Sequence, residues 1–174
     1  LVVLTTDQIA AFTTAQITKL TSAQITALTS DQLTGLSTAD IAAFSTAQIV
    51  AIESADITAG LTTDQIVALT KTQIAAMTTA QMMSLNTAQI SAIETADISS
   101  LKTAQISALT TAQFQLLATA QIAQLTTLQI KAMESADIAV LTTDSWSALK
   151  STQLGAFTSA QVVAFGTEAV SVLT

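Results

Sequence analysis

The chain repeats one eight-residue pattern of apolar and polar positions from Thr5 to Leu173. A clean copy is Thr13-Thr14-Ala15-Gln16-Ile17-Thr18-Lys19-Leu20, and 21 copies follow one another with one extra residue near Gly60. With the octad positions numbered 1 to 8, positions 5 and 8 are apolar in every copy. Positions 1 and 2 are mostly Ser or Thr, and position 4 is Gln in most copies. Positions 5 and 8 are therefore the candidate core of a repetitive fold.

The apolar positions are spaced three residues apart and then five, which favours a helix over a strand. In a strand, the two positions would fall on opposite faces, and one apolar row would face water. In one continuous helix, eight residues advance the chain by about 800°, so the apolar stripe would rotate by about 80° in every copy. The pattern therefore predicts a very short helix that begins again in each octad.

A signal for this restart recurs along the chain. In the run Leu20-Thr21-Ser22-Ala23-Gln24-Ile25, Thr21 can cap a helix and Gln24 follows three residues later, as in a capping box. Leu20 and Ile25 stand at the two positions of a hydrophobic staple. We predict an all-α solenoid of helices of one to two turns, one per octad, in a single domain over residues 1–174. A β-solenoid is the alternative. Many stacked copies are needed, because one octad cannot bury its two anchors alone.

The pattern leaves three local details open. The hydroxyl at position 2 is nearly constant, so either the cap shifts by one residue in some copies or this hydroxyl bonds to neighbouring coils. The Gln at position 4 either completes the capping box, which we favour, or stacks into a ladder between coils. The extra residue lies where Gly60 would make a bend easiest. Position 1 departs from Ser or Thr at Glu53, Asn86, Glu94, Lys102, Ala118, Glu134, Lys150 and Gly166.

The composition excludes several classes of function. The formal net charge is −7 with only five Lys and Arg, which disfavours binding to nucleic acid. The chain has no His and no Cys, so disulfides, zinc sites and nucleophiles that depend on Cys or His are not expected. No apolar run approaches the 18 residues of a membrane span, even in the uncharged stretch from Thr103 to Ile130. We therefore expect no enzyme and no catalytic, cofactor or metal site.

Three acidic pairs are the only candidates for ion chemistry. On one common face they could bind cations weakly or act as paired carboxylates. The interpretation that we favour is electrostatic, because acidic residues stabilise the first turn of a helix. Their spacing of five octads is either one superhelical turn or a duplicated unit. The pairs are Glu53 with Asp56, Glu94 with Asp97, and Glu134 with Asp137.

Larger side chains and Thr rows have simple interpretations. Met82, Met83, Phe114 and Trp146 occupy or adjoin anchor positions, so we expect them to pack in the core rather than form a ligand site. Regular Thr rows could match an ice lattice, but capping and turn hydrogen bonds already explain them.

The run Leu-Thr-Thr-Ala-Gln-Ile-x-Ala-Leu resembles the octad arrays of large repetitive, adhesin-like surface or secreted proteins of bacteria, over Thr5 to Leu173. This resemblance implies an extracellular or cell-surface structural segment: a rigid spacer, a scaffold or a filament subunit. Its partners would be other copies or neighbouring repeats of the same chain. Ala55-Asp56-Ile57 is also similar to the pentapeptide-repeat β-solenoid consensus, but the period of eight counts against that family.

A different class of function remains as the alternative. A repeat face lined by Thr and Gln could make the chain a binding module for ice, a polysaccharide or a partner protein. The chain also starts without Met and in the middle of the pattern, which predicts that it is part of a longer polypeptide.

Overall fold

The computed structural model describes residues 3–173, which form helices and no strand within that range. The predicted all-α class is confirmed, and the β-solenoid alternative is wrong. The chain forms two compact units, one up to Ile93 and one from Glu94 onward, and each is described by itself. That residues 1–174 make a single domain stays a prediction.

Each octad contains one helix of four to seven residues, and η1 is a 3₁₀ helix. In unit 1 the helices are α1 (Thr6–Ala10), α2 (Thr14–Ile17), α3 (Ser22–Thr26), α4 (Ser30–Thr34), α5 (Thr38–Ala43), α6 (Thr46–Ala51), α7 (Ser54–Gly60), α8 (Thr63–Val67), α9 (Lys71–Ala76), α10 (Thr79–Ser84) and α11 (Thr87–Ala92). In unit 2 they are η1 (Thr95–Ser100), α12 (Thr103–Ala108), α13 (Thr111–Gln115), α14 (Thr119–Ile122), α15 (Thr127–Ala132), α16 (Ser135–Ala139), α17 (Thr143–Ala148), α18 (Ser151–Leu154), α19 (Ser159–Val162) and α20 (Thr167–Leu173).

Two backbone hydrogen bonds shape the octad. In the copy that contains α10, the N–H of Met82 at position 5 donates to the carbonyl of Thr78 at position 1, with N and O 3.0 Å apart. The N–H of Leu85 at position 8 donates to the carbonyl of Met82 at 3.3 Å. Leu85 and Asn86 are then both extended, with ψ of 127° and 173°. Two extended residues in succession end one helix and redirect the chain into the next.

Position 1 caps the helices, so the cap does not shift to position 2. Thr78 Oγ1 accepts the N–H of Gln81 at 3.1 Å, and Gln81 Oε1 accepts the N–H of Thr78 at 2.8 Å. The predicted capping box is confirmed. Where position 1 is Lys102, Ala118 or Lys150, the Gln three residues later still accepts its N–H, at 2.7 Å in each case.

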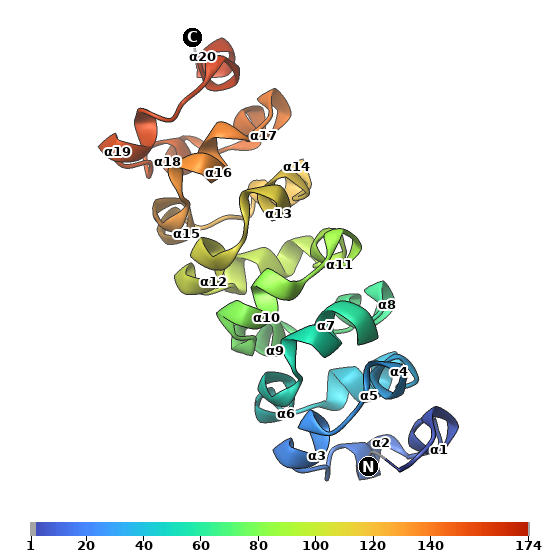
Figure 1. Ribbon diagram of the computed structural model, residues 1–174. Coiled ribbons are helices and arrows are strands. Elements are labelled where there is room, and N and C mark those ends of the chain that lie inside the picture. Colours follow the sequence, from blue (N-terminus) through green and yellow to red (C-terminus); the bar gives the residue numbers. More distant parts are fainter. Residues whose placement is uncertain (1–2, 174) are drawn as a thin grey trace. The chain divides into compact units, whose positions relative to one another are not determined.

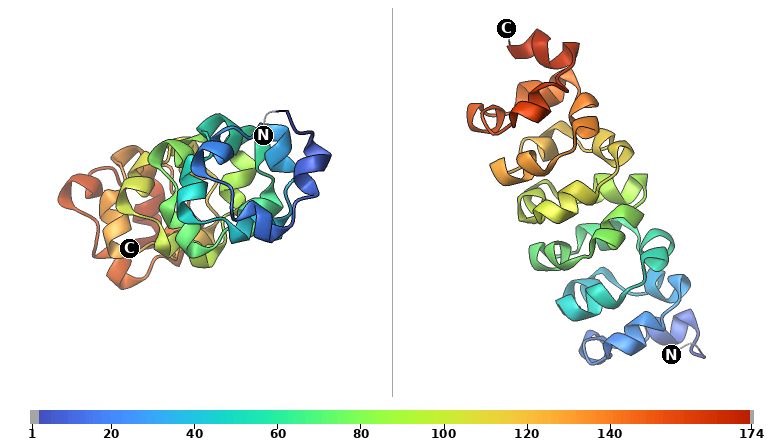
Figure 2. Two further views of the ribbon diagram at one scale, coloured as in Figure 1. Left: turned by 90° about the horizontal axis from the view of Figure 1, so that it is seen from below. Right: turned by 60° about the vertical axis from the view of Figure 1, so that its left-hand side comes forward.

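Three consecutive helices form one coil, and each helix stacks on the helix three places further along the chain. In unit 1 the stacks are α1, α4, α7 and α10; α2, α5, α8 and α11; and α3, α6 and α9. In unit 2 they are η1, α14, α17 and α20; α12, α15 and α18; and α13, α16 and α19. One coil therefore takes three octads, and Figure 2 (left) shows the first coil of unit 1, in blue, as a ring of short helices. The interpretation of five octads as one superhelical turn is wrong.

The core lies inside these coils, because positions 5 and 8 point inward from all three helices. Ile9, Ile41 and Ile57 are fully buried in unit 1, and Trp146 is 1% exposed in unit 2. A side chain that is apolar in every copy thus meets equivalent side chains from the same coil and the next. This packing stabilises many short helices that would not be stable singly.

The extra residue near Gly60 does not create a bend. It lengthens α7 to seven residues, the last of which is Gly60. A Cβ atom at Gly60 would lie 2.8 Å from the carbonyl oxygen of Ser30 and 2.9 Å from its Cα. Glycine is therefore suited to this position because α7 approaches the backbone of α4 closely, within unit 1.

Candidate functional site

The Gln side chains at position 4 form the main polar network between coils. Gln81 is 1% exposed, and its Nε2 donates to the carbonyls of Ile49 and Ile52 at 2.9 and 2.7 Å. These carbonyls belong to positions 5 and 8 of the octad that lies four octads earlier in the chain, at the C-terminal end of α6. Its Oε1 meanwhile remains in the capping box. One amide therefore satisfies an N–H at the start of its own helix and carbonyls at the end of another.

The same arrangement recurs in both units. Gln73 donates to Ile41 and Phe44 at 2.8 Å each in unit 1, and Gln129 donates to Ile98 and Leu101 at 2.7 Å each in unit 2. The box that we favoured and the contact between coils thus coexist, each using a different end of the amide. The contact is made to backbone carbonyls, so it is not a ladder of Gln side chains. Among residues 3–173, no buried side-chain nitrogen or oxygen lacks a hydrogen-bond partner.

Asp at position 4 reverses the direction of this contact. A carboxylate has no N–H to donate, and Asp40 Oδ1 instead accepts the hydroxyl of Thr14, one coil earlier, at 2.7 Å. Asp56 accepts the hydroxyl of Ser30 at 2.6 Å in the same way. Both hydroxyls stand at position 2, so a position 2 hydroxyl that faces an Asp bonds to a neighbouring coil, which is one of the two alternatives that the sequence left open.

Asp137 makes the equivalent contact in unit 2. Its Oδ1 accepts the hydroxyl of Thr111 at 3.1 Å, and its Oδ2 accepts the N–H of Glu134 at 3.0 Å. The side chain is 2% exposed. Burial raises the pKa of Asp137, and the charge of Glu134 adds to the rise, while the two hydrogen bonds oppose it. The desolvation of the charged form is the larger effect.

A second row of hydroxyls, at position 6, also joins coils, and the sequence analysis missed it. Thr34 Oγ1 donates to the carbonyl of Gly60 at 2.8 Å, and Thr26 Oγ1 to that of Ala51 at 2.9 Å. In unit 2, Ser107 Oγ donates to the carbonyl of Ala132 at 2.8 Å. The available signal was the frequency of Ser and Thr at position 6. It was weak, because this position also takes Ala, Val, Met, Lys, Gln and Gly.

The acidic pairs lie at helix starts. Asp56, Asp97 and Asp137 are in the first turns of α7, η1 and α16. Within unit 2, η1 stacks with α14 whereas α16 stacks with α13 and α19, so these two pairs lie on different sides of the coil. Between residues 3 and 173, no three His, Cys, Asp or Glu side chains gather where they could hold a metal ion. The favoured placement in the first helical turn is confirmed.

The large side chains mostly pack as expected. Met82, Phe114 and Trp146 are at most 2% exposed, whereas Met83 is 54% exposed at position 6. Trp146 packs against Phe157 and Phe165, with ring centroids 5.4 and 4.6 Å away. Core packing explains the three buried residues.

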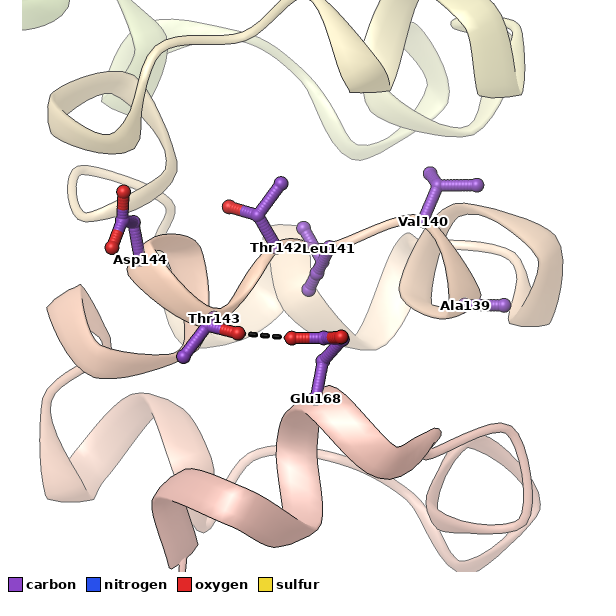
Figure 3. Close-up of a pocket in the computed structure, with 7 residues that line it drawn as sticks. All are labelled: Ala139, Val140, Leu141, Thr142, Thr143, Asp144 and Glu168. Carbon is purple, nitrogen blue, oxygen red and sulfur yellow. Dashed lines mark hydrogen bonds between the residues drawn. The ribbon is translucent and has the colours of Figure 1, made fainter.

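An open hollow in unit 2 is lined by residues 139–144 and Glu168 (Figure 3). The hydroxyl of Thr143 donates to the carboxylate of Glu168, which joins α17 to α20 across the hollow. The other side chains drawn are apolar except for Thr142 and Asp144. The hydrogen bond between Thr143 and Glu168 is therefore a further contact between coils of unit 2.

No helix in the described range, residues 3–173, is both long and apolar enough to cross a bilayer. A family model described as the ALTTAQ repeat matches the chain at residues 1–38, 35–71, 90–127 and 130–167. The letters of that description stand unchanged at residues 108–113, which are positions 7, 8, 1, 2, 3 and 4 of the octad pattern. No curated protein matches the chain.

Proposed function

Because the chain belongs to the ALTTAQ repeat family, we propose that it is a structural repeat segment of a bacterial surface or secreted protein. It serves as a rigid spacer, a scaffold or a filament subunit, and it is not an enzyme. The observation that carries this proposal is the use of buried Gln side chains in both units, such as Gln81 and Gln129, to tie their own helices to an earlier coil. The Gln amide at position 4, a polar group found in most copies of the repeat, therefore stabilises the stack of coils.

The hydroxyls support the same role. Those of Thr14, Thr26, Thr34 and Thr111 donate to groups of the next coil in the same unit. A hydroxyl that is engaged inside the fold is less available to ice, a polysaccharide or a partner protein. A spacer also needs a fold that can lengthen by whole repeats, and stacked repeats provide this because each contacts only its neighbours.

Deleting one coil tests the spacer role. Residues 62–85 are three complete octads, which is one coil. The shortened chain should keep its helical circular dichroism, and small-angle X-ray scattering should show a smaller maximum dimension. Deleting residues 62–81 is the matched control, because it removes two and a half octads and breaks the pattern. An unchanged maximum dimension after the one-coil deletion would contradict the spacer role.

The cellular location has its own test. Antibodies raised against the 174-residue chain should label intact cells of the source bacterium or detect the protein in the culture medium. Labelling only after the cells are broken open would contradict the surface or secreted location, without bearing on the spacer role.

A further inference from the structure

Charged side chains are sorted onto different sides of unit 2. One side is the stack of α12, α15 and α18, and Figure 1 shows α12 and α15 there, opposite α14 and α17. The octads of this stack contain all three lysines of the unit and no acidic residue. The octads of the other two stacks contain all six acidic residues and no lysine. The lysines are Lys102, Lys131 and Lys150, and the acidic residues are Glu94, Asp97, Glu134, Asp137, Asp144 and Glu168. We call the stack of α12, α15 and α18 the lysine side of unit 2.

The amines of the lysine side are available to a partner. All three lysines are exposed, and no ion pair joins them to an acidic residue within residues 3–173. Lys131 belongs to α15, which stacks on α12 and on α18. Its exposure is therefore a property of the side of the unit and not of an end of the stack.

An apolar side chain stands in the middle of the lysine side. Leu128 is 66% exposed on α15, the central helix of the three. It is the only large apolar residue at position 3 of any octad, where most copies have Ala. Leu128 and Lys131 are three residues apart, a spacing that makes them neighbours on the surface of a helix. A leucine that stays exposed adds no burial to the core, so the packing of the chain does not explain it.

A complementary hollow lies on the acidic sides of the same unit. It is the hollow of about 480 Å³ that Figure 3 shows, which is ample for a leucine side chain. Ala139, Val140 and Leu141 give it an apolar lining, and the carboxylates of Asp144 and Glu168 lie beside them. The hollow is bounded by α17 and α20, which stack on each other, so it opens at the side of the unit.

We propose that Leu128 of one copy of the chain enters this hollow in unit 2 of a second copy. The leucine then contacts Val140 and its apolar neighbours, and Lys131 faces the carboxylates of Asp144 and Glu168. An apolar anchor in a pocket with charges at the rim is the usual arrangement of a protein interface. The partner is a second copy because this chain carries both halves of the match in charge and in shape. The two halves lie on different stacks, so the contact is heterologous. This inference rests on the proposed structural role and names its partner.

Sedimentation velocity of the 174-residue chain over a range of concentrations tests the contact. The unchanged chain should form oligomers whose average mass grows with concentration. Leu128→Ala restores the residue that most octads have at position 3 and removes the apolar anchor. Ala139→Lys fills part of the hollow and repels Lys131, and position 6, where Ala139 stands, already carries a lysine in α15. Each variant alone should self-associate about tenfold more weakly.

Mixing the two variants gives the sharpest result. Leu128→Ala keeps the hollow and Ala139→Lys keeps the leucine, so the mixture should form a dimer that grows no further. The matched controls lie in unit 1: Met83→Ala removes another exposed apolar side chain, and Ala10→Lys adds the same amine at an exposed position 6. Both controls should associate like the unchanged chain, and circular dichroism checks that every variant is folded.

The charge of Lys131 is tested separately. Lys131→Gln keeps the length of the side chain nearly the same and removes its charge, so self-association should weaken about two- to fivefold. Lys19→Gln removes an exposed lysine from unit 1 and is the control. Equal affinities of these two variants would remove the carboxylates of the hollow from the contact.

Three results would overturn the proposed contact: a monomer at every concentration, Leu128→Ala and Ala139→Lys variants that associate like the unchanged chain, or a mixture that forms no dimer. A monomer that instead binds phosphatidylglycerol vesicles through Leu128 would assign the lysine side to a membrane surface and would also overturn it. A monomer that still shortens when residues 62–85 are deleted would leave the spacer role in place. A chain that associates through Leu128 but does not shorten would contradict the spacer role instead, so the two proposals fail separately.

Discussion

Gln16 and Gln81 stand at the same position of nearly identical octads in unit 1, yet they do different work. Both accept the N–H of the capping residue three positions earlier, at 2.8 Å. Gln81 is buried and also donates to the carbonyls of Ile49 and Ile52 in an earlier coil, whereas Gln16 is exposed in the first coil. The local sequence sets the capping box, and the neighbouring coil sets the second role. Groups that another coil covers should therefore be much more sensitive to substitution.

The largest difference is expected for Gln→Ala at these two positions. Gln81→Ala removes the acceptor for the N–H of Thr78 and the Nε2 donor to two buried carbonyls. The carbonyl of Ile49 keeps the N–H of Ile52 as a donor, whereas the carbonyl of Ile52 loses its Gln donor. We expect a loss of about 3 kcal/mol in the free energy of unfolding. Gln16→Ala loses only its part of an exposed box, with a cost of about 0.5–1 kcal/mol. Urea denaturation followed by circular dichroism at 222 nm measures both, and equal losses would contradict the assigned bridge.

Two glycines extend the comparison from hydrogen bonds to contact distance. Gly60→Ala places a Cβ atom against the backbone of Ser30, which belongs to another coil of unit 1. Backbone cannot move aside as a side-chain end can, so we expect a destabilisation of about 1–3 kcal/mol. Gly155→Ala meets only the Ser151 and Thr152 carbonyls of its own helix, the nearer at 3.4 Å. This control should be neutral or stabilising by up to about 1 kcal/mol in the same assay. A tolerated Gly60→Ala would show that α7 can move away from α4.

A smaller effect is expected from the two hydrogen bonds of the capping box taken separately. The Oε1 atom of Gln121 accepts the N–H of Ala118, but Ala118 has no hydroxyl that could accept the N–H of Gln121 in return. Ala118→Thr should restore the second bond and stabilise the chain by about 0.5–1 kcal/mol. Thr126→Ala, in the next octad of unit 2, removes that same bond and should destabilise it by about 1 kcal/mol. Thermal unfolding of both variants gives the comparison. If Ala118→Thr has no effect, the Gln half of the box would be sufficient by itself.

The sequence predicts the local structure well because each octad carries its own start and stop signals. Thr21 and Gln24 form the expected box, with Gln24 Oε1 accepting the N–H of Thr21 at 2.8 Å, and α3 begins at Ser22. The number of octads per coil could not be predicted. All octads are nearly alike, so stacks of three, four or five would place the same residue types against one another.

The Gln contacts between coils could not be predicted from the sequence for a related reason. A single Gln amide serves its own helix through Oε1 and another coil through Nε2, so the local role already accounts for the residue in the pattern. The close approach at Gly60 is also a long-range property. Its contact with Ser30 depends on how coils stack, and no feature of the octad around Gly60 indicates that partner.

The last prediction concerns Asp137, where coverage by a coil affects a proton. Burial raises the pKa of its carboxyl in the folded chain above the ordinary value near 3.8. The folded chain therefore holds this proton more tightly than the unfolded chain, and proton binding stabilises the fold. That contribution is complete below the ordinary pKa and is lost as the pH rises through the raised pKa.

Asp137→Asn keeps the shape of the side chain and removes its titration. The free energy of unfolding of this variant should therefore fall less than that of the unchanged chain as the pH rises over this range. Asp144→Asn removes the same formal charge at an exposed position and is the control. Urea denaturation at a series of pH values makes the comparison. Parallel curves for the unchanged chain and Asp137→Asn would mean that the contact with Thr111 offsets the desolvation of the carboxylate.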